Sequence, residues 1–338
     1  MRVLEMAAPA LDASATEIVD RPLPTPGPGQ LSIDVAFAGV NFIDVMARRG
    51  DAGYASGWPY VPGLEVVGTV RAVGDGVTEP RVGDRVAAVT AGGGFAEVAV
   101  VPAALAIAVP DAVASEQAAA APLVFSTAVL LLEEFVRLRP GESVLMHSAG
   151  GGVGSAVAQV AAVVADAPRI GVVGDASRSD AAARAGWNHV VTTGAGPAAV
   201  RELLPEGVDA VLDPTGTVNL DFDLEVAAPG ARVVLFGNPA GGAPPPLPPV
   251  GRLIGGNVGL FGFSISSLRR TRPTAVAAAL QRSLALLASA RLAVAVLAGG
   301  SAIGSRTFSC PVMLRPSDGF SLSRWPSCRR YSTAPARS

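Results

Sequence analysis

A glycine-rich turn at positions 148–154 contains the residues whose types and spacing most clearly point to chemistry. It reads S-A-G-G-G-V-G and lies between an apolar run at 142–147, which predicts a strand, and a run of small residues at 155–165, which predicts a helix. This context is typical of a dinucleotide-binding fingerprint, in which small residues let the backbone approach a pyrophosphate. The free N–H groups and the dipole of the helix start then hold that group. The motif predicts contacts from Ala149, Gly150, Gly151, Gly152, Val153 and Gly154.

The composition limits the remaining function classes. The chain has 338 residues, enough for roughly two domains, and half of them are apolar. A net charge of −2 argues against nucleic acid as a partner, and the chain has no run of about 18 uninterrupted apolar residues that would indicate a membrane span. The N-terminus lacks the long apolar core of a signal peptide, so we expect a cytoplasmic protein. Two cysteines exclude a disulfide framework and a four-cysteine zinc site, and the absence of lysine excludes Schiff-base chemistry.

The strand and helix patterns divide the chain. Short strands and turns dominate its first part and predict a compact β-barrel-like domain over 1–118. Strands and helices alternate beyond it, so we expect an α/β protein whose second domain, over 119–255, is a doubly wound parallel sheet with helices on both faces. Residues 301–338 carry six Arg and one Asp with little hydrophobic periodicity. We therefore expect residues 297–338 to form an atypical, poorly ordered basic tail.

Several motifs follow one another in order along the first 295 residues. They are VNFID at 40–44, VPGLE at 61–65 followed by Gly68, VGDRV at 82–86, FSTA at 125–128, RPGE at 139–142, HSAGGGVG at 147–154 and GVD at 207–209. In these motifs the chain resembles the zinc-free quinone oxidoreductase branch of the medium-chain dehydrogenase/reductases. The resemblance implies a GroES-like β-barrel built from both ends of the chain, with a Rossmann domain inserted and residues 256–296 returning to the barrel. It also implies a homodimer.

The same resemblance implies an activity, in which NADPH donates hydride to a quinone or an α,β-unsaturated carbonyl. Polyketide enoyl reductases share most of these motifs, so an enoyl-thioester reductase of a biosynthetic pathway remains an alternative. A protein that binds NADPH with little turnover is another. Zinc-dependent relatives place Cys and His ligands near the positions of Asn41 and Leu64, whereas no Cys occurs here before Cys310. We therefore expect no zinc at the reacting atom.

Residues that follow later strands are expected to hold the two ends of the cofactor. At the adenosine end the resemblance implies that Arg178 pairs with the 2′-phosphate of NADPH, with Gly174 and Ser177 beside it. Asp175 lies two residues beyond the position of the acid that binds ribose in NAD enzymes, which leaves NADH as an alternative. At the nicotinamide end the expected contacts are Asn41, Thr127, Gly237, Asn238, Phe263 and Ser264.

The proton that must follow the hydride has no clear donor in the sequence. Tyr54 lies two residues from the position of a cleft tyrosine in relatives, and Asn41 is the other candidate for a direct catalytic role. The alternative for Asn41 is a turn-capping role, and the alternative for Tyr54 is that of an amphipathic aromatic on a loop. Neither His147 nor His189 has a partner at metal-ligand spacing, so we expect His147 to bond backbone and His189 to lie at the surface. A strand that returns to the barrel, as in the family, is not recognisable after Leu297.

Overall fold

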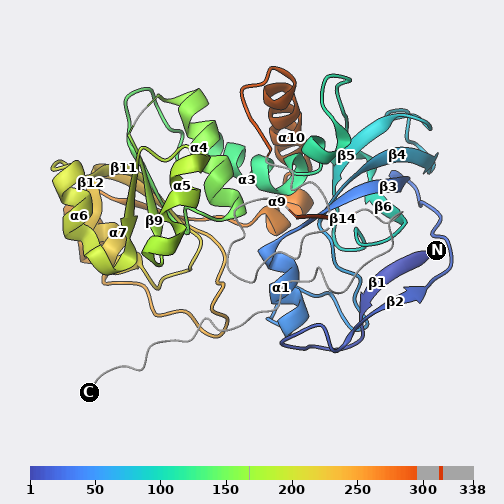
Figure 1. Cartoon of the computed structure of the whole chain (residues 1–338), viewed down its shortest axis with the longest axis horizontal. Helices are drawn as coiled ribbons and strands as arrows, with labels where there is room; N and C mark the ends of the chain where they lie inside the picture. Colours follow the sequence, from blue (N-terminus) through green and yellow to red (C-terminus); the bar gives the residue numbers. More distant parts are fainter. Residues whose placement is uncertain (167, 295–311, 315–338) are drawn as a thin grey trace.

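Two six-stranded sheets organise the protein. The structure is a computed structural model that describes residues 1–166, 168–294 and 312–314. In Figure 1 the blue and cyan strands of one sheet and the green and yellow strands of the other stand on opposite sides, with α1 (Phe42–Arg49), α3 (Ser126–Val129) and α9 (Ile265–Thr271) between them. The predicted combination of a barrel-like domain and a doubly wound sheet is confirmed.

The first sheet is antiparallel and has the strand order β14-β3-β4-β5-β7, with β6 also paired to β3. Its strands are β3 (Gln30–Val40), β4 (Glu65–Val73), β5 (Arg85–Val89), β6 (Val98–Pro102), β7 (Ala106–Ala108) and β14 (Val312–Leu314). A separate ribbon pairs β1 (Arg2–Met6) with β2 (Thr16–Asp20). Apolar side chains such as Ile33, Val66 and Phe95 are fully buried in one cluster, which forms the core of this domain.

Strand β14 corrects one expectation about the tail. Residues 312–314 pair antiparallel with residues 38–40 of β3, so part of the tail does return to the barrel. The physical reason is local: β6 covers only residues 30–34 of that edge of β3, and the apolar run Val-Met-Leu can complete the ladder beyond it. The expected disorder of the tail otherwise concerns residues outside the described part of the chain.

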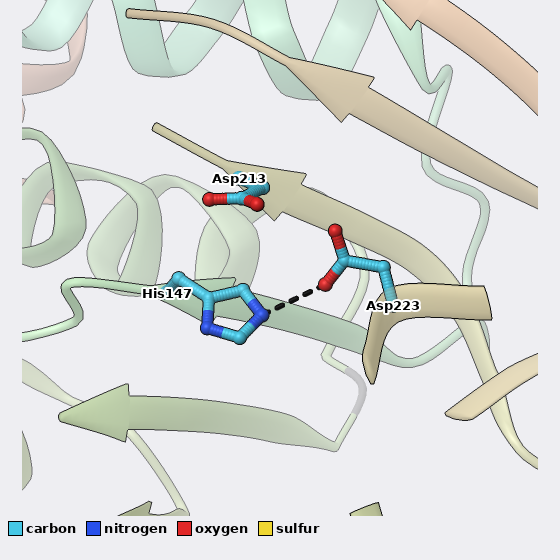
Figure 2. A group of neighbouring side chains, drawn as sticks. All are labelled: His147, Asp213 and Asp223. Atoms are coloured by element: carbon cyan, nitrogen blue, oxygen red, sulfur yellow. Dashed lines mark hydrogen bonds and ion pairs between the residues drawn. The ribbon is translucent and has the colours of Figure 1, made fainter. Parts of the chain in front are cut away.

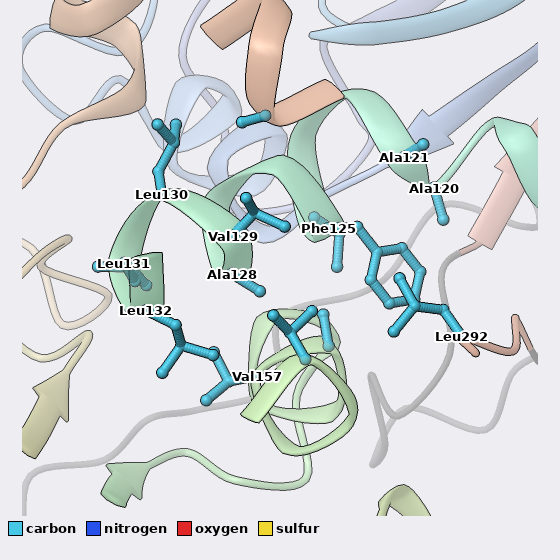
Figure 3. Close-up of a cluster of buried hydrophobic side chains, with 14 of the residues drawn as sticks. Ala120, Ala121, Phe125, Ala128, Val129, Leu130, Leu131, Leu132, Val157 and Leu292 are labelled. Atoms are coloured by element: carbon cyan, nitrogen blue, oxygen red, sulfur yellow. The ribbon is translucent and has the colours of Figure 1, made fainter. Parts of the chain in front are cut away.

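A buried helical segment connects the two sheets. It comprises α2 (Ser115–Ala118), the π-helical η2 (Ala121–Phe125), α3, and the π-helical η3 (Leu130–Phe135). Figure 3 shows its side chains, among them Phe125 and Leu132, meeting Val157 and Leu292 in one apolar cluster. Residues 115–135 are long and apolar enough to cross a membrane, but their most apolar stretch is 83% buried inside the protein. Packing in the core therefore accounts for their composition.

The second sheet is parallel throughout, with the order β10-β9-β8-β11-β12-β13. Strand order reverses at β8, and ligands of doubly wound sheets bind outside the carboxyl ends of the strands at such a reversal. His189, at the start of β10, is exposed as expected. The elements of this domain are β8 (Val144–His147), α4 (Gly152–Val164), β9 (Arg169–Val173), η4 (Ala176–Arg178), α5 (Ser179–Ala185), β10 (His189–Thr192), η5 (Thr193–Ala195), α6 (Gly196–Leu203), β11 (Val208–Asp213), α7 (Leu220–Val226), β12 (Ala227–Leu235), α8 (Val250–Gly256) and β13 (Gly259–Gly262).

The return toward the barrel begins later than residue 256. β13 pairs with β12 and is still a strand of the parallel sheet. After α9, the helix α10 (Pro273–Ala288) packs against η2 and α3 and against η1 (Ala103–Leu105) and β7 of the barrel domain. Apolar residues of α10, including Leu280 and Leu284, are fully buried there. This helix therefore joins the cores of the two domains.

Gly68 should be required for the β3–β4 pairing. A Cβ at this position would lie 2.0 Å from the backbone oxygen of Asp34, and backbone cannot yield as a flexible side chain can. We expect Gly68→Ala to lower the free energy of unfolding by roughly 2–3 kcal/mol in chemical denaturation. Gly262→Ala is the control, because this strand glycine has open space where a Cβ would be. Equal midpoints for the two variants would contradict the prediction.

Candidate functional site

A deep cleft of about 1090 Å³ runs between the two domains, over the carboxyl ends of the parallel strands. It receives residues from β8, β9 and the loop after β12 on one wall and from α1 and the loop after it on the other. Thirteen of the predicted site residues line it: Asn41, Tyr54, Thr127, Gly150, Gly151, Gly152, Val153, Gly174, Arg178, Gly237, Asn238, Phe263 and Ser264. Residues that are far apart in the sequence are thus brought to one site.

The glycine turn forms the middle of the cleft wall. Ser148 adopts a left-handed backbone (φ 58°), the chain turns, and α4 begins after Gly151. Because the first N–H groups of a helix have no partner within the helix, this end of α4 presents donors and a positive dipole to the cleft. The arrangement fits an anionic group such as a pyrophosphate.

Two of the predicted fingerprint residues lie behind this surface. A Cβ on Gly154 would come within 2.5 Å of the backbone oxygen of Ala149, so only glycine allows α4 to approach the turn this closely. Ala149 is fully buried, and its carbonyl accepts a hydrogen bond from Trp187 Nε1 at 3.1 Å. Both residues shape the turn through packing, and neither lines the cleft.

The adenosine end of the cleft lies beyond β9. The Asp175 carboxylate accepts a hydrogen bond from the Ser177 backbone N–H at 3.0 Å and another from the Ser177 hydroxyl. It also lies 3.6 Å from Arg178 Nε. Asp175 Oδ1 is therefore engaged by its own turn. Asp175 and Arg178 both line the cleft, whereas Ser177 does not. The Arg178 side chain is 42% exposed and can be reached by an anion from solvent.

At the nicotinamide end, buried Glu65 organises the wall. Its Oε1 accepts a hydrogen bond from Asn41 Nδ2 at 2.7 Å, and its Oε2 accepts one from the Leu123 backbone N–H at 2.8 Å. Asp44 accepts hydrogen bonds from the backbone N–H groups of Asn41 (2.8 Å) and Gly63 (3.0 Å). The Asn41 amide is thus held by a carboxylate from the barrel that also holds the start of η2. Asn41 is also the N-cap of α1, where it forms a capping box with Asp44, and it lines the cleft.

These two carboxyl groups titrate at unusual pH. Burial raises the pKa of Glu65 to about 7, and burial likewise raises the pKa of Asp44 to about 7. Their hydrogen bonds to N–H donors oppose the shift but do not cancel it. Around neutral pH each group is therefore poised between its neutral and its charged form.

Several cleft residues were missed by the sequence analysis. Tyr60 is almost fully buried, and burial raises its pKa to about 12, so its hydroxyl stays protonated. Arg269 and Arg270 of α9 also line the cleft, and Arg269 donates to the backbone oxygen of Thr90 across the domain boundary. The arginine pair lies five and six residues after the predicted contact at Ser264, and this proximity in the chain is the signal that could have revealed it.

His147 departs from its predicted role. Its Nε2 lies 2.8 Å from Asp223 Oδ1, so its partner is a carboxylate and not backbone (Figure 2). Asp223 comes from α7, which follows 76 positions later in the chain, and no local pattern joins the two. The side chains of both are buried, and His147 borders the floor of the cleft.

Replacing Glu65 should weaken the pH dependence of stability. The Glu65 pKa is about 7 in the folded chain against an ordinary value of 4.5, so the folded state binds this proton more tightly. The contribution of Glu65 to the free energy of unfolding is therefore full below pH 4.5 and is lost as the pH rises through about 7. Between these pH values the free energy of unfolding should fall less in Glu65→Gln than in the unmodified chain. We expect the two decreases to differ by roughly 2–3 kcal/mol.

The measurement is chemical denaturation at several pH values. Glu206→Gln, at an exposed position, is the matched control and should leave the profile unchanged. A Glu65→Gln profile that runs parallel to that of the unmodified chain would show that Glu65 does not titrate as described.

Comparisons with known proteins agree with this architecture. Residues 27–111 match the alcohol dehydrogenase GroES-like domain, and residues 152–282 match the zinc-binding dehydrogenase domain. The human synaptic vesicle membrane protein VAT-1 homolog is 36% identical over 216 residues, which cover 63% of this chain and 55% of that protein. The chain thus spans about half the length of its VAT-1 relatives. A probable quinone oxidoreductase of Schizosaccharomyces pombe is 35% identical over 239 residues, 68% of this chain and 69% of that protein.

Solved structures extend the likeness to nearly the whole described chain. A mycobacterial protein in complex with NADPH is 35% identical and has a TM-score of 0.79, covering 88% of this chain and 91% of that one. The Escherichia coli quinone oxidoreductase in complex with NADPH is 26% identical and has a TM-score of 0.78, with the same coverage. The two matched domains, the relatives and the shared fold lead to one conclusion: the chain belongs to the quinone oxidoreductase branch of the medium-chain dehydrogenase/reductase superfamily.

Proposed function

We propose that this protein is an NADPH-dependent reductase that transfers hydride to a quinone or an α,β-unsaturated carbonyl without a metal ion at the reacting atom. The observation that carries the proposal is the cleft, which joins the anion-binding start of α4 and the Arg178 guanidinium to a partly apolar pocket at the other domain. Two structures that share this fold were solved with NADPH.

The chain's own residues fit this cofactor. The start of α4, where Gly154 permits close packing, would hold the pyrophosphate. Arg178 would pair with the 2′-phosphate, because guanidinium binds phosphate through two parallel hydrogen bonds. Since Ser177 binds one oxygen of Asp175 and Arg178 lies beside the other, Asp175 competes less for the ribose hydroxyls than a free acid at the strand end would. This geometry favours NADPH over NADH.

When bound, NADPH supplies the hydride. The protein orients the reactants, excludes water and supplies a proton. Asn41, held by Glu65 on the barrel side, and Thr127 of the connecting segment would face the nicotinamide ring. Leu64, Leu123 and Phe263 line the same end and exclude water. Tyr54 lines the cleft, and its hydroxyl would donate the proton that completes the two-electron reduction; burial raises the pKa of this phenol and makes it a weaker acid.

The residues at this end do not fit a reaction zinc. Leu64 lies on the cleft wall where zinc-dependent relatives need a histidine, and it offers no ligand atom. Both oxygens of Glu65 are engaged by Asn41 and Leu123, and Asp44 is held by two backbone N–H groups. No step of the reaction is therefore assigned to a metal ion.

One observation favours a second acceptor, an enoyl thioester. Arg269 and Arg270 line the cleft beside Phe263 and Ser264, and cations there would attract the phosphates of a thioester carrier. An uncharged quinone gains no binding energy from these cations.

The proposal also includes a cytoplasmic homodimer. The dimer is supported by β13, which ends the parallel sheet, and by its half-exposed Phe261.

Turnover with a panel of acceptors tests the proposed activity. We expect NADPH oxidation at about 1 s⁻¹ or faster with a simple quinone or an enone, followed by absorbance at 340 nm. A rate that is higher with crotonyl thioester than with every quinone would favour the enoyl reductase. Binding of NADPH without turnover on the whole panel would contradict the reductase and leave a nucleotide-binding protein.

Replacing Arg178 should raise the KM for NADPH and leave the KM for NADH nearly unchanged. In Arg178→Gln the KM for NADPH should rise about tenfold or more, because a charge-assisted phosphate contact is lost, while the KM for NADH should change little. Arg184→Gln is the control, since Arg184 is an exposed arginine on the next helix and does not line the cleft. An equal change for both nucleotides would contradict the assignment of Arg178 to the 2′-phosphate.

A further inference from the structure

Three buried side chains with metal-ligating atoms meet beneath the cofactor cleft. His147 ends β8, Asp213 ends β11, and Asp223 lies on α7, so the fold brings them together from three separate elements (Figure 2). Their side chains are almost completely inaccessible to solvent. One ligand atom from each lies within 4.8 Å of the other two. The cluster is distinct from the nicotinamide end of the cleft, where Asn41 and Leu64 lie.

Half of the carboxylate oxygens in this cluster have no hydrogen-bond donor. Asp213 Oδ1 accepts from the backbone N–H of Thr215 at 2.8 Å and from its hydroxyl at 2.6 Å. Asp223 Oδ1 faces His147 Nε2. The second oxygens, Asp213 Oδ2 and Asp223 Oδ2, are buried and find no donor among the described residues. Figure 2 shows the second oxygen of Asp223 on the side of Asp213.

The charges of the cluster do not balance. Two carboxylates face one imidazole, and no ion pair with an arginine reaches either carboxylate in the described part of the chain. Even a protonated His147 would leave one negative charge in excess. Two neighbouring buried carboxylates cannot both stay ionised unless a cation lies between them.

We propose that His147, Asp213 and Asp223 bind a divalent transition-metal ion, best matched by Zn²⁺. One imidazole nitrogen and two carboxylate oxygens form a mixed donor set that suits zinc, which takes three protein ligands and one further ligand. Neighbouring ligands at bond lengths of about 2.0–2.2 Å stand roughly 3 Å apart or more, so the 2.8 Å between His147 Nε2 and Asp223 Oδ1 needs only a small adjustment.

The surroundings of the cluster match a metal site in two further respects. Thr215 fixes Asp213 through two hydrogen bonds, and Asn219 Nδ2 in turn donates to the Thr215 hydroxyl at 2.9 Å, so one ligand is oriented by a second layer of contacts. His147, Thr215 and Asn219 all border the cleft, which gives an ion a path from solvent. The ion would tie the end of β8, where the cofactor turn begins, to β11 and α7.

Zinc binding to the full chain tests this proposal directly. The protein is stripped with a chelator and dialysed, and its melting temperature is followed as Zn²⁺ is added, with Mg²⁺ as the comparison ion. We expect about one equivalent of bound zinc by elemental analysis and a rise in Tm of about 5 °C at saturation, with no rise from Mg²⁺.

Two sets of variants locate the ion. Asp223→Asn and, independently, Asp213→Asn should abolish the zinc-dependent rise in Tm. His189→Gln, at the exposed histidine, should keep it, and so should Cys310→Ser/Cys328→Ser, which removes the only thiols of the chain.

The proposal is overturned if zinc neither remains bound nor raises Tm, or if the rise persists in both aspartate variants. In the first case the two carboxylates share a proton, and Asp223→Asn, which imitates the neutral acid, should be at least as stable as the unmodified chain. All of these measurements are independent of hydride transfer, so they stand apart from the proposed reductase activity.

Discussion

The site depends on how closely the start of α4 can approach the end of β8. Gly154 permits that approach, because any side chain there would meet the Ala149 carbonyl. The consequence is a helix start whose free N–H groups point into the cleft at the place where the strand order of the sheet reverses. If α4 were displaced, the anion-binding donors would be lost, and the residues that follow β9 and β12 would no longer line the same cofactor site.

The other half of the cleft depends on a buried carboxylate. Glu65 ties the Asn41 amide of the barrel domain to the first turn of η2 in the connecting segment. Arg49 adds a second connection, donating at 2.9 Å to the backbone oxygen of Pro239 in the loop after β12. These contacts fix the position of one domain relative to the other, and a reductase needs that position fixed because hydride transfer requires donor and acceptor at close range.

Local signals were readable from the sequence, and long-range partners were not. The turn at 148–154 was predictable because strand, glycines and helix are adjacent in the chain. The partnership of His147 with Asp223 was not, because it arises only when α7 folds back over the sheet. The pairing of residues 312–314 with β3 was missed for a similar reason, since three apolar residues carry no pattern until a free strand edge lies beside them. Arg269 and Arg270 were missed because surface arginines are common in any helix.

The most direct test of the central claim is energy transfer from tryptophan to a reduced nicotinamide nucleotide in a binding titration. Trp187 is suited to report it, because its indole is hydrogen-bonded to Ala149 in the cofactor turn itself. If the cleft is an NADPH site, tryptophan emission should be quenched with saturation at micromolar NADPH, and NADH should require far higher concentrations. Absence of quenching by either nucleotide, or equal affinity for both, would contradict the account.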